Sequence, residues 1–104
     1  MHAKNFIDDV VASNTSLLAL YAQGSRGQTR LGALLDGLAL ADGQREQVLA
    51  LIKLAIDDAT YQLVCSIEGS ASLGDSQQDY TLLDEAGNTL TGALDALLYD
   101  KLNT

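Results

Sequence analysis

Residues 42–67, DGQREQVLALIKLAIDDATYQLVCSI, carry the clearest helical pattern in the chain. One apolar stripe recurs at steps of three and four residues and predicts an amphipathic helix; it consists of Val48, Leu51, Ile52, Ala55, Ile56 and Ala59. Asp42 suits the N-cap and Gly69 suits the end of this helix. The run TYQLVCSI, residues 60–67, also suits a strand because it is rich in β-branched and aromatic residues. Since no helix breaker precedes the run, we expect the helix to continue to about residue 67.

Two more helices are expected before this segment. Residues 3–22 carry apolar side chains at helical spacing, and Gly24 predicts the end of that helix. Residues 25–28, SRGQ, match the capping-box pattern S-x-x-Q, which predicts that a second helix opens there. That helix would carry four leucines on one face, namely Leu31, Leu34, Leu35 and Leu38.

The pattern changes in residues 79–92, DYTLLDEAGNTLTG, which predict a β-hairpin. Its turn would span 84–88, with Gly87 in the left-handed conformation. Thr91 or Gly92 would then cap a last helix, whose apolar residues include Leu94, Leu97 and Leu98. The expected fold is therefore mainly α with a small β part (α+β): a three-helix N-terminal bundle, a β-hairpin and a C-terminal helix. The hairpin would lie on the helices, or pair its edge with a second copy in a homodimer.

Length and composition are those of a single globular domain over residues 1–104. Hydrophobic residues make up 47% of the chain and charged residues 19%. No apolar run approaches the ~18 residues of a membrane span, and the N-terminus lacks the pattern of a signal peptide. The single cysteine, Cys65, lies in an apolar run and is expected to be a small buried side chain. These features favour a cytoplasmic protein.

The formal net charge of −8 is distributed unevenly. Residues 1–53 hold five acids and five bases, whereas residues 54–104 hold nine acids and one base. Such a surface repels nucleic acid and anionic membranes and attracts cationic proteins. The alternative is that the acidity only keeps a small protein soluble.

Several functional motifs are matched only in part, because a residue that each motif requires is missing. The run GSASLGDS, residues 69–76, has the glycine spacing of a phosphate loop, but Asp75 stands where the lysine is needed. In the run from Asp75, a calcium loop would need glycine at Tyr80 and glutamate at Ala86. His2 is the only histidine, which makes a serine or cysteine nucleophile hard to activate and leaves too few ligands for zinc. We therefore expect no enzyme activity, no metal site and no cofactor.

The small size, the acidity and the segment IEGSASLGDSQQDYTLLDEAGNTLTG, residues 67–92, resemble small bacterial immunity proteins that protect a cell from toxins. The resemblance covers about a quarter of the chain. It implies a one-to-one inhibitor of a basic toxin, often a nuclease, with no catalysis of its own. Charge complementarity would then speed association and set specificity.

The partner face is expected on the acidic part of the sequence. Its predicted residues are Asp75, Asp79, Tyr80, Asp84 and Glu85, with Asp57 and Asp58 as outliers. Tyr80 suits a core position equally well. The alternative function is a homo-oligomeric structural or regulatory module, for which the acidity would be incidental.

Overall fold

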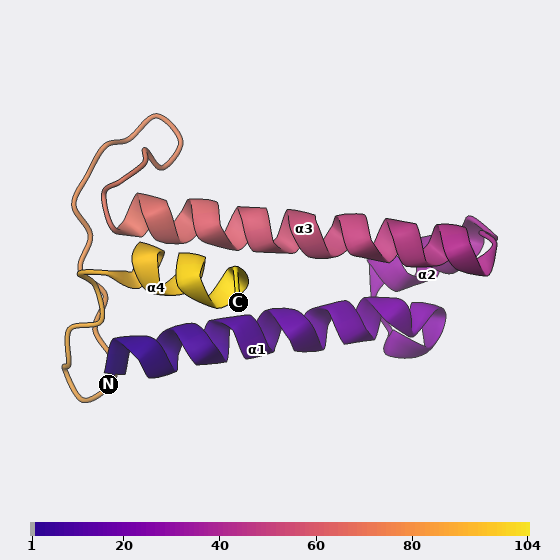
Figure 1. The fold of residues 1–104 in the computed structure, drawn as a ribbon, viewed down its shortest axis with the longest axis horizontal. Helices are drawn as coiled ribbons and strands as arrows, with labels where there is room; N and C mark the ends of the chain where they lie inside the picture. The colour runs from indigo at the N-terminus through magenta and orange to yellow at the C-terminus, as the bar shows by residue number, and fades with distance from the viewer. Residues whose placement is uncertain (1) are drawn as a thin grey trace. The chain divides into compact units, whose positions relative to one another are not determined.

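The computed structural model describes residues 2–104, which fold into helices joined by turns and one long loop (Figure 1). The helices are α1 (His2–Ala22), a 3-10 helix η1 (Gly24–Gly27), α2 (Arg30–Gly37), α3 (Asp42–Ile67) and α4 (Leu94–Leu102). A mainly α protein is thus confirmed, and so is the helical state of residues 60–67. None of the described helices combines the length and apolarity that crossing a bilayer requires.

The predicted β-hairpin is wrong, because residues 2–104 contain only isolated bridges, Leu73 with Ser76 and Leu83 with Thr89. The predicted turn does form, and Gly87 has the left-handed φ of 87° that it requires. Two backbone amides that would bond between strands in a longer hairpin donate to side chains instead. The Leu82 amide donates to Thr91 Oγ1 at 3.4 Å, and the Gly92 amide donates to the carboxylate of Glu68 at 2.8 Å. A lone pair of strands is marginal in water, and here it is reduced to single bridges. The predicted dimer through a strand edge therefore has no strand to pair.

The C-terminal end of α3 lies where the sequence predicted it. Gly69 adopts φ 82°, and its amide donates to the Ser66 carbonyl at 3.3 Å. The Ser70 amide donates to the Cys65 carbonyl at 3.0 Å. These two bonds form a Schellman motif, which places Gly69 at its left-handed position. Cys65 itself is half-buried rather than fully buried as predicted.

The predicted start of α2 is wrong. Residues 25–27 do not cap α2 but form part of η1, and Gln28 follows η1 with a left-handed φ of 58°. The N-cap is Thr29, whose hydroxyl accepts from the Gly32 amide at 2.9 Å. Asp42 is likewise in the first turn of α3 instead of preceding it, and the Gln44 side chain accepts from the Ala41 amide at 3.2 Å. In both cases a neighbouring polar side chain takes the capping bond.

The described chain divides into two compact units. Unit 1 comprises the residues up to Val11 together with Asp57–Thr104, and unit 2 comprises Ala12–Ile56. Both α1 and α3 continue from one unit into the other. The single domain expected from the length stays a prediction.

Unit 1 is built around a closed apolar core. Ile7 from α1, Val64 from α3, and Leu94 and Leu98 from α4 are at most 5% exposed. Figure 1 shows α4 between the N-terminal part of α1 and the C-terminal part of α3, so that three helices surround these side chains. Partly buried side chains, including those of Phe6 and Tyr61, extend this core.

Unit 2 has a much smaller interior. Among the large apolar side chains that the structure describes in this unit, Leu35 alone is buried. The 3-10 helix η1 and α2 approach closely at Gly32, where a Cβ atom would collide with the Gly24 carbonyl oxygen. A polar junction adds to this contact. Asp36 accepts from the Ser25 amide at 2.8 Å and from Arg45 Nη1 at 3.0 Å.

The predicted face of four leucines on α2 is only partly buried. The four leucines do border one groove, but Leu34 is 74% exposed and Leu38 is 61% exposed. Unit 2 thus leaves two of the four leucines of this face in water.

Candidate functional site

The two units differ sharply in charge. Unit 1 holds eleven acidic and two basic residues, a net charge of −9, whereas unit 2 holds three acidic and four basic residues, a net charge of +1. The excess of acid that the sequence places after residue 53 therefore belongs to one compact unit.

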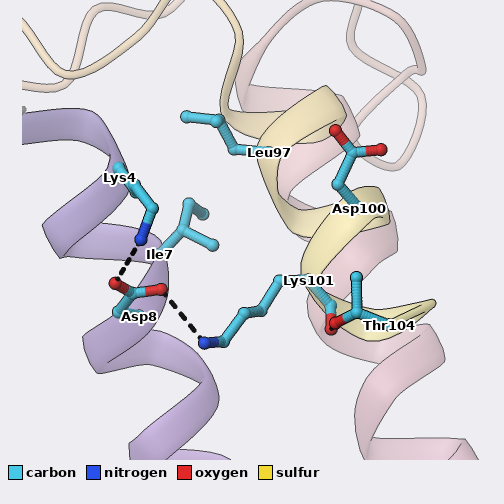
Figure 2. A pocket seen from close by; sticks show the side chains of 7 residues that line it. All are labelled: Lys4, Ile7, Asp8, Leu97, Asp100, Lys101 and Thr104. Carbon is cyan, nitrogen blue, oxygen red and sulfur yellow. Dashed lines mark hydrogen bonds and ion pairs between the residues drawn. The ribbon is translucent and has the colours of Figure 1, made fainter.

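Both bases of unit 1 are engaged by a single acid (Figure 2). Lys4 Nζ lies 3.0 Å from Asp8 Oδ2, and Lys101 Nζ lies 3.3 Å from Asp8 Oδ1. These bonds, from Lys4 first and Lys101 second, hold the pKa of the Asp8 carboxyl below its usual 3.8. The three residues border a cavity of about 260 Å³ between α1 and α4. Asp8 therefore engages both lysines of unit 1.

The predicted partner residues separate into exposed and structural groups. Asp75, Asp79 and Glu85 are exposed on the loop between α3 and α4, and Asp58 is exposed on α3. None of these four forms an ion pair within residues 2–104. We call them the acidic set. Asp57 is only half-exposed and already takes part in an interaction within the chain.

Asp84 has a structural role in its turn. Its carboxylate accepts from the amides of Ala86 at 3.0 Å and Asn88 at 2.8 Å, and from Asn88 Nδ2 at 2.9 Å. These bonds, those from Asn88 above all, hold the pKa of the Asp84 carboxyl below its usual 3.8. His2 Nδ1 lies 4.0 Å away. Replacing Asp84 would therefore change the loop as well as its charge.

Tyr80 lies in a small apolar hollow instead of among the acids. The hollow has a volume of about 220 Å³ and is bordered by Ile67, Leu73 and Leu82 as well. Tyr80 is half-buried there. Tyr80 thus lines an apolar hollow, and its part in a partner face stays a prediction.

Sequence reasoning missed the role of Glu68. This side chain follows the last turn of α3, and its carboxylate accepts from the amides of Gly92 at 2.8 Å and Leu94 at 2.7 Å. Ala93, the N-cap of α4, offers no side-chain bond, so Glu68 supplies the cap from 24 to 26 residues away. The one signal in the sequence was an acid at a helix C-terminus, where the helix dipole disfavours it.

Unit 2 contains an apolar groove between α2 and α3 that was not predicted as a site. Its volume is about 350 Å³. The lining residues are Leu31, Leu34, Leu35, Leu38, Val48 and Ile52. The sequence placed these side chains on the apolar faces of two helices.

Two further features bear on the candidate site, namely metal-binding clusters and similarity to known proteins. No cluster of three or more histidine, cysteine or carboxylate side chains within residues 2–104 is suited to hold a metal ion. Comparison with protein families, with curated proteins and with solved structures finds no match for this chain.

Proposed function

We propose that this chain is a non-catalytic cytoplasmic binding protein that neutralises a basic protein partner through unit 1. In its most specific form, the proposal is immunity against a toxin, with a basic nuclease as the expected target. The observation that carries it is the charge of −9 in unit 1, where the two lysines are both held by Asp8.

The acidic set gives this proposal a mechanism. Uncompensated carboxylates on an exposed loop produce a negative potential that draws a cationic surface toward unit 1. Complementary charge of this kind raises the association rate and selects the partner, and salt weakens it. The apolar hollow beside Tyr80 lies in the same unit and offers a short-range contact for an approaching side chain.

The test compares two double variants with the same change in net charge. Asp75→Asn with Asp79→Asn removes two charges from unit 1, and Asp42→Asn with Glu46→Gln removes two exposed charges from unit 2. The tagged protein first captures its partner from the native lysate, and association rates with the purified partner are then measured at low and high salt.

We expect one basic protein in stoichiometric amount, and an association rate at low salt that falls about tenfold for the unit 1 variant. The unit 2 variant should stay within about twofold, and inhibition of a nuclease by the complex would support the immunity role. Equal slowing by both variants would show that only total charge matters. Unchanged rates for both would place the partner face elsewhere.

A further inference from the structure

We infer that the apolar hollow beside Tyr80 receives an arginine side chain of the basic partner, and that Asp79 binds the guanidinium group of that arginine. The inference rests on the proposed function and specifies a contact that would hold the partner once charge has drawn it near. We call the hollow together with Asp79 the Tyr80 pocket. All of its residues belong to unit 1.

The lining of the pocket matches the two parts of an arginine side chain. The hollow has a volume of about 220 Å³, which is below the ~300–1,000 Å³ of pockets for drug-sized ligands and is sufficient for one side chain. Ile67, Leu73 and Leu82 supply apolar walls, and the half-buried Tyr80 supplies an aromatic ring. The methylene stem of arginine packs on apolar walls, and its planar cation stacks on aromatic rings better than the compact, strongly hydrated ammonium group of lysine does.

Asp79 places a carboxylate beside this lining. It directly precedes Tyr80 in the chain, and its Oδ1 lies 3.6 Å from the position that a Cβ atom would take at Gly69, two residues after Ile67. Asp79 is exposed and forms no ion pair within residues 2–104. The nearby Glu68 is different, because its carboxylate already accepts from backbone amides at the start of α4. Asp79 is therefore the acid that can bind a cation in the pocket.

Charge selects a cationic occupant over an apolar one. Unit 1 has a net charge of −9, so its field favours the approach of a positive side chain and opposes a negative one. An apolar side chain in the hollow would displace water from Asp79 without offering the carboxylate a hydrogen bond, which is unfavourable. A guanidinium group replaces that water with charge-assisted hydrogen bonds.

The walls of the pocket are held in place by the rest of unit 1. Leu73 and Ser76 exchange two backbone hydrogen bonds of 2.9 Å, which close a tight turn at one wall. Leu82 packs against the apolar core, and its carbonyl accepts from the amide of Leu90, which is 6% exposed, at 2.8 Å. A pocket whose walls are already formed binds a side chain with little loss of conformational entropy.

The test is a heteronuclear NMR titration of the full chain with N-acetyl-arginine N-methylamide, a probe that carries one arginine side chain and no other charge. Its matched control is the citrulline analogue, which has nearly the same shape without the charge, and the ionic strength is kept constant. We expect saturable shifts of the Leu73, Tyr80 and Leu82 amide signals with a dissociation constant of about 1–10 mM. The citrulline analogue should bind at least about tenfold more weakly.

Two variants with the same change in charge locate the cation. Asp79→Asn should weaken binding of the arginine probe about tenfold. Asp58→Asn, its control, removes another exposed acid of unit 1 and should stay within about twofold. Asp58 lies nine residues before Ile67 on α3, which is roughly 13 Å along the helix axis. Circular dichroism checks the helical content of both variants, and the citrulline comparison needs neither of them.

An arginine probe that shifts the signals of the hollow and depends on both its charge and Asp79 supports the inference. Three results overturn it: no saturable shift at the hollow, equal binding of the citrulline analogue, or equal weakening by the two variants. The proposed function is tested separately, because the probe requires no partner protein. If the probe binds as expected and no basic protein is captured from the lysate, the arginine pocket stands and the neutralising function is wrong. If a basic protein is captured but the probe leaves the hollow unchanged, the pocket is wrong and the function stands.

Discussion

Unit 1 and unit 2 show two ways in which a helical sequence can divide its residues between core and surface. Unit 1 closes an apolar core around Leu94 and Leu98, both 0% exposed, and accounts for the net negative charge of the chain. Unit 2 is nearly neutral and leaves Leu34 and Leu38 in water. An apolar stripe at helical spacing therefore identifies one face of a helix, but it does not show whether the same chain buries that face.

The largest test of this difference compares Leu98→Ala in unit 1 with Leu35→Ala in unit 2. We expect Leu98→Ala to lower the free energy of unfolding by about 4 kcal/mol, because its closed surroundings leave a cavity. Leu35 borders the open groove, where neighbours can relax, so we expect about 2 kcal/mol. Urea denaturation at low protein concentration measures both. Equal losses would show that the two cores are equally well packed.

A second pair compares the caps of the two short helices. Glu68→Ala removes a charged acceptor from two amides at the start of α4 and should cost about 2 kcal/mol. Thr29→Ala removes one neutral acceptor at the start of α2 and should cost about 1 kcal/mol. Urea denaturation again measures the difference, and Glu68→Gln, which keeps one acceptor, should fall between Glu68→Ala and the original chain. A larger loss for Thr29→Ala would reverse the ranking of the two units.

The smallest effects concern pH. Hydrogen bonds from Asn88 lower the pKa of Asp84, and bonds from Ser25, with Arg45 in addition, lower the pKa of Asp36 below the usual 3.8. Each carboxylate therefore stabilises the fold above pH about 4, and this stabilisation is lost as pH falls through the lowered folded pKa. The stability difference between the original chain and Asp84→Asn or Asp36→Asn should be present at pH 7 and vanish at strongly acidic pH.

The stabilising contributions of Asp36 and Asp84 should differ in their dependence on salt. Asp36 is ion-paired with Arg45 at 3.0 Å, so 1 M salt should reduce its contribution at pH 7. Asp84 relies mainly on short hydrogen bonds within its turn and should be less sensitive. Thermal unfolding of the two variants at low and high salt measures this contrast, and equal sensitivity would contradict the distinction between them.

Local sequence signals predicted the long helices and several of their ends. The bounds of α1 and α3 followed from periodicity and from glycines, since Gly69 needs no partner beyond its own helix. The hairpin prediction was wrong partly because the Glu68 carboxylate, 24 residues away, accepts from the Gly92 amide, and sequence spacing does not show such a bond. The start of α2 failed for a local reason, because Thr29 competes with Ser25 for the same role.

From the sequence, only the negative charge of the candidate site could be predicted. The exposure of Asp75, Asp79 and Glu85 follows from acids in a glycine-rich loop. The turn role of Asp84 is a local Asx pattern that sequence could have revealed. The apolar groove of unit 2 could not be found in this way, because a stripe of leucines has the same spacing whether or not the chain buries it.

The hydrogen bonds that Glu68 accepts from the amides of Gly92 and Leu94 also join the two ends of the loop between α3 and α4. Ser70 Oγ reinforces this junction by donating to Asp95 Oδ2 at 3.0 Å. The intervening chain is thus a closed loop with an exposed two-residue turn at Gly74 and Asp75. Because doubling the length of a flexible loop costs only about 0.6 kcal/mol, that turn is suited to carry an inserted peptide or a backbone cut while α4 stays docked.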